Sequence, residues 1–318
     1  MRFYAAPMEG LTGYIFRNAH RACFPGTDAY FTPFVSPNQN HEFSAREIND
    51  LLPEHNAGTP VIPQILTNNA DDFLWAARAI ADMGYAEVNL NLGCPSPTVV
   101  TKGKGSGMLG DLCALDRFLD GIFASSPVKI SVKTRIGLND EGHFPVLIEI
   151  FNRYPLAELI VHPRVQADMY KKPVRMEAFE DIVKEYRGRL VYNGDLFSPE
   201  GISALSQKYT ELTGIMCGRG LIANPHLFGV CMGLSAPDKA ILRTFHDTIL
   251  EGYQKTMPGD KALLFKMKEL WTYMGCLFPE RGSFDKKLRK ASKLSEYKAL
   301  TDSLFSDYEP VFSAFYRP

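Results

Sequence analysis

The sequence predicts an α/β protein, a (β/α)8 TIM barrel followed by a small all-helical C-terminal domain. Three observations predict this architecture. Strand-like and helix-like segments alternate over about 235 of the 318 residues, and the usual length of such a barrel is about 250 residues. Polar or reactive side chains stand at the ends of seven of the eight predicted strands. After Leu234 the alternation stops and only helical patterns follow.

The eight predicted strands are short segments with the alternating or continuous apolar pattern of a β-strand. They cover Arg2–Glu9, Ala29–Val35, Pro60–Leu66, Glu87–Gly93, Lys129–Ile136, Leu156–Arg164, Arg189–Asp195 and Gly214–Gly220. Because the chemistry of a TIM barrel lies at the C-terminal ends of its strands, the polar residues there predict a pocket.

Amphipathic helical patterns lie between these strands. In the clearest, Asp71–Met83, apolar residues recur at helical spacing and Asn69 is placed to cap the N-terminus. The others are Tyr14–Cys23, Leu115–Ala124, Phe144–Tyr154, Met176–Tyr186 and Pro199–Tyr209, with a shorter one near Ser44–Leu52.

We predict two domains, residues 1–235 and residues 236–318. Helical patterns in the second cover Lys239–Tyr253, Lys261–Leu277 and Phe284–Tyr297. Between Arg281 and Lys298 seven basic residues stand against two acidic ones, although the whole chain has a net charge of −1. Most basic segments of this size are only solvated helix faces.

Composition indicates a soluble globular protein, with 45% hydrophobic and 22% charged residues. The six cysteines are scattered without a C-x-x-C pair, which favours a reducing compartment over a disulfide scaffold. We find no metal-binding spacing, no signal peptide and no apolar stretch long enough to span a bilayer. We therefore expect a cytoplasmic protein without a metal site.

The strand that ends at Gly93-Cys94-Pro95 is the most informative segment. Val88, Leu90 and Leu92 alternate with two asparagines, the pattern of a half-buried strand. Gly and Pro shape a sharp turn that presents the Cys94 thiol next to the glycine-rich loop 102–107. A free cysteine is more often a small core residue, but this polar setting favours a proton donor or nucleophile.

The ends of the seventh and eighth strands predict a phosphate site. They read Asn193-Gly194-Asp195 and Gly218-Arg219. Barrels often bind phosphate with the loops after these strands, and glycines let backbone N–H groups approach phosphate oxygens while an arginine adds a charged hydrogen bond. These turns favour a phosphate-bearing cofactor.

Together these residues resemble the tRNA-dihydrouridine synthases over essentially the whole chain. The resemblance rests on Ala6-Pro7-Met8-Glu9-Gly10, Asn89-x-Asn91-x-Gly93-Cys94-Pro95, Val132-Lys133-Thr134-Arg135, His162, Asn193-Gly194-Asp195 and Gly218-Arg219. It implies an enzyme that binds FMN and reduces the C5=C6 bond of particular tRNA uridines, with NADPH as the electron donor. It also implies that Cys94 is the general acid that protonates C5.

By the same resemblance, the cofactor residues fall into three groups. Pro7, Met8 and Glu9 would line the flavin ring; Gln64, Lys133 and His162 would hydrogen-bond the ring or its side chain; Asn193, Gly194, Asp195, Gly218 and Arg219 would hold the phosphate. The chain departs from the family pattern at Pro97 and Pro163, which puts details of RNA contact in question.

For the tRNA substrate we expect contacts from two places. Asn91 and Arg135 stand at strand ends, and Lys286, Arg289, Lys290 and Lys293 recur at spacings of three and four, so that one face of a single helix could display all four. Two alternatives stay open: an FMN barrel enzyme that acts on a free base, and a tRNA-folding protein without catalysis. We expect a monomer.

Overall fold

The computed structural model describes residues 1–317, so that Pro318, the end of the predicted helical domain, lies outside the described residues. The chain forms two compact units. The barrel unit comprises Met1–Pro7, Asp28–Asp195 and Ser206–Met216, and the helical unit comprises Met8–Thr27, Leu196–Leu205 and the chain from Cys217 onward. The helical unit thus includes two segments that precede residue 235. The predicted division into residues 1–235 and 236–318 stays a prediction.

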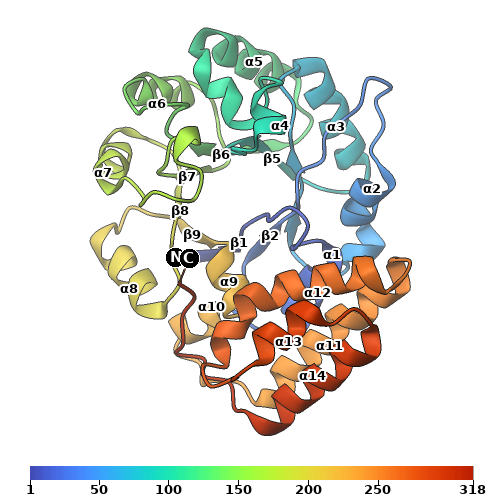
Figure 1. The fold of residues 1–318 in the computed structure, drawn as a ribbon. Coiled ribbons are helices and arrows are strands. Elements are labelled where there is room, and N and C mark those ends of the chain that lie inside the picture. The colour runs from blue at the N-terminus through green and yellow to red at the C-terminus, as the bar shows by residue number, and fades with distance from the viewer. Residues whose placement is uncertain (318) are drawn as a thin grey trace. The chain divides into compact units, whose positions relative to one another are not determined.

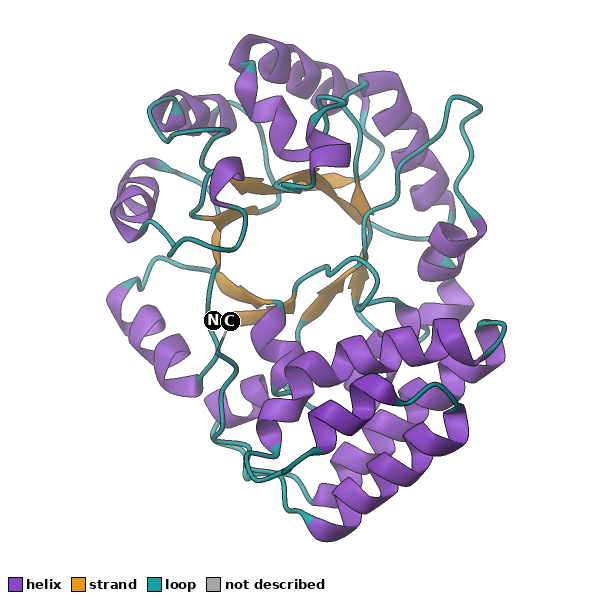
Figure 2. Ribbon diagram, in the orientation of Figure 1, coloured by secondary structure: helices purple, strands orange, loops and turns teal. Residues whose placement is uncertain are grey.

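The barrel unit is built on one nine-stranded parallel sheet with the order β3-β2-β1-β9-β8-β7-β6-β5-β4. The strands are β1 (Arg2–Ala5), β2 (Ala29–Phe31), β3 (Val61–Ile62), β4 (Gln64–Ile65), β5 (Glu87–Leu92), β6 (Lys129–Arg135), β7 (Leu159–His162), β8 (Leu190–Asn193) and β9 (Gly214–Cys217). Every predicted strand contains at least one of them, and together they form the ring of strands in Figure 2. The predicted TIM barrel is confirmed.

The ring closes because β3 and β4 are two halves of one predicted strand, Pro60–Leu66. Pro63 separates them, since a proline has no N–H to donate to a sheet. On one side of the proline β3 pairs with β2, and on the other side β4 pairs with β5. The first and last strands of the sheet are thus joined through a single residue.

Helices surround the ring in the barrel unit (Figure 1). They are α2 (Ala45–Leu51), α3 (Ala70–Asp82), α4 (Pro97–Val100), α5 (Leu112–Ser125), α6 (Phe144–Asn152) and α7 (Met176–Glu185), while α8 (Pro199–Lys208) crosses the division between the units. The predicted cap is present, because the Asn69 side chain accepts a hydrogen bond from the Asp72 N–H at 3.0 Å.

Strand β5 is buried on both faces, from Val88 to Leu92. The expectation that this strand is half-buried is therefore wrong. In a closed barrel one face of each strand points to the interior and the other is covered by helices, so even the polar face of β5 is removed from water. The asparagines of this face must find hydrogen-bond partners inside the protein.

The helical unit packs its helices around an aromatic cluster that includes Phe16, Phe245 and Trp271. Its helices are α1 (Tyr14–Cys23), α9 (Arg219–Ala223), α10 (Leu227–Cys231), α11 (Lys239–Thr256), α12 (Asp260–Met274), α13 (Phe284–Lys290) and α14 (Leu294–Asp307). Within the cluster the Tyr297 hydroxyl bonds to the Trp271 indole N–H at 2.8 Å and to His246 Nε2 at 2.6 Å. The helical C-terminal region is as predicted. None of the helices in the described chain is long and apolar enough to cross a membrane.

The basic segment does not form a single helix, so that part of the prediction is wrong. Helix α13 ends at Lys290, and Lys293 is the residue before α14. Acidic side chains stabilise the new helix start, because Glu296 accepts from the Ser292 and Lys293 N–H groups and Asp260 accepts from the Leu294 N–H at 2.9 Å. The four predicted RNA-binding residues are divided between two elements.

Candidate active site

The turn at Cys94 is held by the side chain of Asn91. Its Oδ1 accepts hydrogen bonds from the backbone N–H groups of Gly93 at 3.0 Å and Cys94 at 2.9 Å. Only the oxygen of the amide can accept, so its nitrogen must face the other way. That nitrogen donates to Gln64 Oε1 at 2.7 Å.

From Gln64 the amide chain continues across the sheet. Gln64 Nε2 donates to Asn89 Oδ1 at 2.8 Å, and Asn89 Nδ2 donates to the Ser131 hydroxyl at 3.0 Å. Gln64, Asn89 and Ser131 are fully buried. The predicted flavin ligand Gln64 therefore has both ends of its amide engaged in this chain, and Ser131 is a structural member that the sequence analysis did not identify.

A second set of contacts holds the carbonyl side of the same turn. Ser106 donates to the Cys94 carbonyl oxygen from its hydroxyl at 2.8 Å and from its N–H at 3.2 Å. Gly105 has a φ of +58°, and a Cβ there would lie 2.9 Å from the same oxygen, so only glycine fits. The glycine-rich loop is thus packed against Cys94 as the start of a short 3-10 helix, Gly105–Gly110.

Lys133 lies beside this turn, since it pairs in register with Asn91 on the neighbouring strand. Its side chain is partly buried, and no hydrogen bond or ion pair to its ammonium group is found among the described residues. Burial, and after it the positive charge of Arg135, lower its pKa to about 7, whereas Cys94 acts in the opposite direction. An anion close to this lysine would be stabilised by it.

Arg135 braces the backbone of the turn from the other side. Its Nε donates to the Gly93 carbonyl at 3.0 Å and its Nη1 to the Val165 carbonyl at 2.9 Å. Its Nη2 is buried without a hydrogen-bond partner in the described structure. The guanidinium lies 5.2 Å from the ring centre of Tyr170, a side chain that is 52% exposed. Sequence analysis missed Tyr170, because nothing in its local pattern reveals the contact with Arg135.

His162 belongs to an ion-paired group at the ends of β7 and β8. Arg164 donates from Nη1 to His162 Nε2 at 2.9 Å and to Asp195 Oδ1 at 3.0 Å, and its Nη2 pairs with the second Asp195 oxygen. The arginine is 1% exposed. Because this guanidinium engages the Asp195 carboxylate, a phosphate contact from Asp195 would have to come from its backbone N–H.

Asn193 ties two strands together, since its Nδ2 donates to the Met216 carbonyl at 2.8 Å. Gly194 follows it, and Pro7 ends the first segment of the barrel unit.

Pro163 lacks an N–H, but its carbonyl accepts from the Arg175 N–H at 2.7 Å and so fixes the loop after β7.

The remaining predicted residues belong to the helical unit. Met8 N–H donates to the Thr12 hydroxyl at 2.8 Å, Gly218 precedes α9, and the Arg219 guanidinium lies 5.4 Å from the Phe197 ring centre. Glu9, the basic residues Lys286, Arg289 and Lys290 of α13, and Lys293 before α14 complete this group. The structure thus brings together Gln64, Asn91, Cys94, Lys133 and Arg135 in the barrel unit, and a shared site with the helical-unit residues stays a prediction. No group of three or more potential metal ligands occurs among residues 1–317.

Comparison with known proteins gives consistent relatives. The sequence matches the model of the family described as "Dihydrouridine synthase (Dus)" over residues 4–306. "Probable tRNA-dihydrouridine synthase 2" of Bacillus subtilis is 29% identical, over 71% of this chain and 70% of that protein. A probable tRNA-dihydrouridine synthase of Staphylococcus epidermidis is 30% identical over the same shares. "Probable tRNA-dihydrouridine synthase 1" of Synechocystis is 28% identical over 96% of this chain and 86% of that protein.

Solved structures show a similar fold at low identity. A variant of NCR from Zymomonas mobilis gives a TM-score of 0.53 with 16% identity, over 77% of this chain and 90% of that chain. Morphinone reductase in complex with tetrahydroNAD gives a TM-score of 0.51 with 14% identity over the same shares. At these identities the likeness concerns the fold alone.

Replacing Asn91 by Ala should destabilise the barrel unit and loosen the turn. The change leaves two backbone N–H groups and the Gln64 oxygen without a partner, and a buried group left unsatisfied costs about 1–3 kcal/mol. We expect a lower urea midpoint and faster alkylation of Cys94 by iodoacetamide. Asn91→Asp keeps the acceptor but not the donor, so its urea midpoint should lie between those of the parent and Asn91→Ala. The exposed Asn139→Ala is the control; equal midpoints for the two alanine variants would refute the role of Asn91.

The lowered pKa of Lys133 predicts a pH dependence of stability. The folded-state pKa of about 7 lies below the ordinary lysine value of 10.5, so between these values the unfolded chain binds more protons. Stability from this group therefore rises with pH across that window, by at most about 1.4 kcal/mol per pH unit. Urea unfolding of ligand-free protein at several pH values should show this slope, and Lys133→Met should reduce it. The same slope in both proteins would contradict the assignment.

Proposed function

The chain belongs to the dihydrouridine synthase family and is an enzyme, and from this premise we propose that it reduces the C5=C6 bond of tRNA uridines with bound FMN and with NADPH as the electron donor. The observation that carries the proposal is the position of Cys94: two sets of hydrogen bonds hold its backbone after β5, and Lys133 and Arg135 interact electrostatically with it. A cytoplasmic location and a monomeric state are kept as predictions.

The residues around Cys94 fit an anionic, hydrogen-bonding cofactor. The ammonium group of Lys133 has no partner among the described residues, and Arg135 Nη2 is buried without one. Burial lowers the pKa of both side chains, so a negative charge nearby would stabilise their protonated forms. When bound, FMN would supply the hydride that reduces C6. Lys133 is the residue we assign to the electron-rich side of the flavin ring.

We assign Cys94 the proton transfer to C5. One hydride at C6 and one proton at C5 balance the reduction, and the Cys94 thiol supplies the proton. The thiolate that remains lies close to Lys133 and Arg135, whose pKa values Cys94 raises in turn. We assign Lys133 and Arg135 the role of balancing the negative charge that is left on the sulfur. Asn91 and Ser106 do not take part in the transfer but position the sulfur by fixing the backbone on both sides.

Tyr170 is a candidate contact for the uracil base. Its ring is half exposed, it lies over the Arg135 guanidinium, and its centre is 6.0 Å from that of His162. A base that has been extruded from folded RNA is commonly stacked on an aromatic side chain. The ring position on the loop after β7 supports this role.

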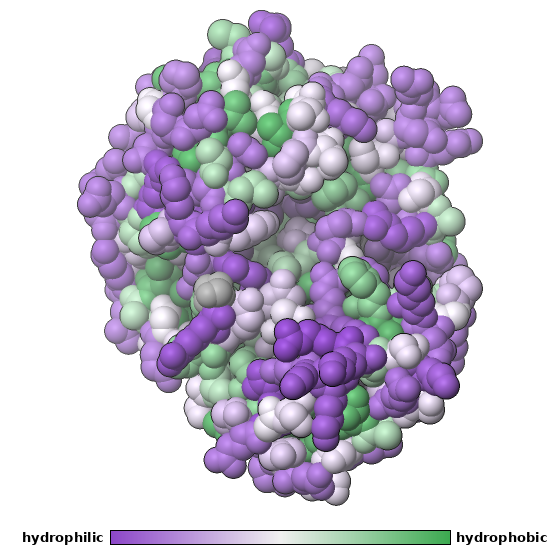
Figure 3. Space-filling view, viewed as in Figure 1, coloured by the Kyte–Doolittle hydropathy of each residue, from purple (hydrophilic) through white to green (hydrophobic). Residues whose placement is uncertain are grey.

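The exposed lysines of α13 are the candidate tRNA backbone surface. Lys286, Lys287 and Lys290 are exposed, and no ion pair to them occurs among residues 1–317. Figure 3 shows hydrophilic side chains gathered over this helix. Unpaired cations can release counterions from a phosphate backbone on binding, whereas a free base would gain little from them. This favours tRNA over a free base as the substrate.

Replacing Cys94 by Ala should separate proton transfer from electron transfer. Because general acid catalysis contributes about 10²–10⁴-fold, dihydrouridine formation in tRNA should fall by that factor. Flavin absorbance and NADPH oxidation by oxygen should remain. Dihydrouridine is measured by mass spectrometry of digested tRNA, with the exposed Cys113→Ala as control. Near-parent activity of Cys94→Ala would exclude it as the acid, and free uridine reduced as fast as tRNA would favour a free-base enzyme.

Replacing Lys286, Lys290 and Lys293 by Gln should make tRNA binding less dependent on salt. Each neutralised phosphate contributes a slope of roughly −0.9 in a plot of log affinity against log salt on a duplex. We expect a slope that is shallower by up to about three such contributions, with unchanged flavin reduction by NADPH. The control replaces three exposed lysines of the barrel segments, Lys129, Lys184 and Lys208. An unchanged slope would place tRNA on another surface.

A further inference from the structure

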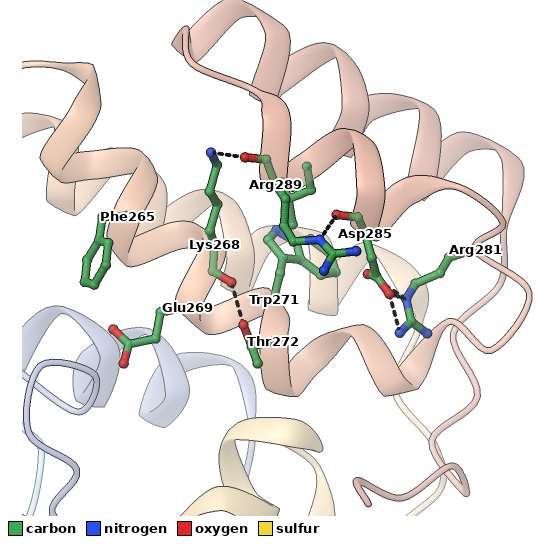
Figure 4. A pocket seen from close by; sticks show the side chains of 9 residues that line it. Phe265, Lys268, Glu269, Trp271, Thr272, Arg281, Asp285 and Arg289 are labelled. Carbon is green, nitrogen blue, oxygen red and sulfur yellow. Dashed lines mark hydrogen bonds and ion pairs between the residues drawn. The ribbon is translucent and has the colours of Figure 1, made fainter. Parts of the chain in front are cut away.

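The helical unit contains a cavity of about 540 Å³ between α12 and α13 (Figure 4). This volume lies within the range of small-molecule sites, about 300–1,000 Å³. Four of its lining residues, Phe265, Lys268, Glu269 and Thr272, recur at helical spacing on one face of α12. Arg289 of α13 also lines the cavity, and the ring of the buried Trp271 lies behind it in Figure 4.

Phe265 leaves an aromatic ring in solvent at this cavity. It is 67% exposed, more than any other large hydrophobic side chain of residues 1–317, whereas Trp271 is 2% exposed. Folding gains little from Phe265 in this position. An exposed ring beside a hollow is suited to stacking with a planar ligand.

The charged groups of the cavity divide into those already paired and those that are not. Arg281 and Asp285 neutralise each other through two-point contact at 2.8–3.0 Å. Lys268 donates to the Ala291 and Arg289 carbonyls at the end of α13. Arg289 donates one hydrogen bond, from Nε to the Asp285 backbone carbonyl at 3.3 Å. Its terminal nitrogens and the Glu269 carboxylate have no partner among the described residues.

We propose that this cavity binds one unpaired guanosine nucleotide of the RNA, a role that rests on the proposed function. Guanine alone among the four bases presents two adjacent donors, N1–H and N2–H, which match the two oxygens of Glu269. Uracil, cytosine and adenine place an acceptor beside their donor, and the Glu269 carboxylate repels that acceptor. The base stacks on Phe265, and Arg289 contacts the phosphate.

The surroundings favour RNA over an isolated nucleotide as the natural occupant. Lys286 and Lys290 are exposed on the same helix as Arg289. They extend the positive charge beyond the cavity, where a polymer has further phosphates and a mononucleotide has none. A guanosine in this cavity would anchor one point of the RNA on the helical unit.

The chain has two tryptophans, Trp75 and Trp271, which gives a direct readout. In a Trp75→Phe background of the full-length flavoprotein, tryptophan emission reports on the cavity alone. Titration with guanosine 5′-monophosphate should change this emission saturably, and uridine 5′-monophosphate should not. Phe265→Ala should weaken binding by roughly 5- to 150-fold, the range for loss of one base–aromatic stack. Glu269→Gln should remove the preference for guanosine.

Phe315→Ala and Glu280→Gln are matched controls, since both side chains are exposed in the same unit but do not line the cavity; they should bind like the parent. An absent response to the guanosine nucleotide, an equal response to the uridine nucleotide, or parent-like binding by Phe265→Ala would overturn the proposal. Dihydrouridine formation in tRNA is measured on the same preparations. Guanosine binding without tRNA reduction would refute the proposed function alone, and tRNA reduction without guanosine binding would refute the cavity assignment alone.

Discussion

Closure of the barrel removes the polar face of β5 from water, and this constraint shapes the whole site. Asn89, Asn91 and Gln64 bond to one another in a fixed direction that begins at the backbone N–H groups of the Cys94 turn. Since the backbone can only donate there, the orientation of each amide follows from the one before it. An interior that must satisfy its own polar groups thereby fixes the backbone that carries the Cys94 thiol.

The same burial sets the electrostatics of the site. Lys133 and Arg135 lie on one strand, two residues apart; after burial, the charge of Arg135 lowers the pKa of Lys133, and burial lowers the pKa of Arg135. Arg135 meets part of the cost of burial through two backbone carbonyls, and the Lys133 ammonium has no partner among the described residues. The lowered lysine pKa follows from this arrangement, and the proposed anionic cofactor and thiolate would both draw on the same two side chains.

In the helical unit, one buried hydrogen-bonded group fixes the helix packing. A buried Tyr297 hydroxyl joins the indole of α12 to the imidazole of α11 and fixes how these helices pack. The basic segment beside it is free to remain polar and exposed, because Leu288 and Phe284 supply the apolar contacts of α13. Lys286, Lys287 and Lys290 of this helix make no ion pair among the described residues, which suits them to the proposed contact with phosphates.

The sequence by itself determined the strands, most of the helices and the residues at the strand ends, because periodicity and Gly or Pro at the turns act locally. It also marked Cys94 and Lys133 as candidate site residues, which stay predictions. Only the tertiary structure decided that Asn91 and Arg135 brace the turn, that Arg164 pairs with Asp195, and that Tyr170 lies over Arg135. It also divided the basic segment at Ala291, since the acidic groups that cap α14 include Asp260, far away in sequence. These features depend on which side chains the strand register and helix packing bring face to face, and no local pattern contains that information.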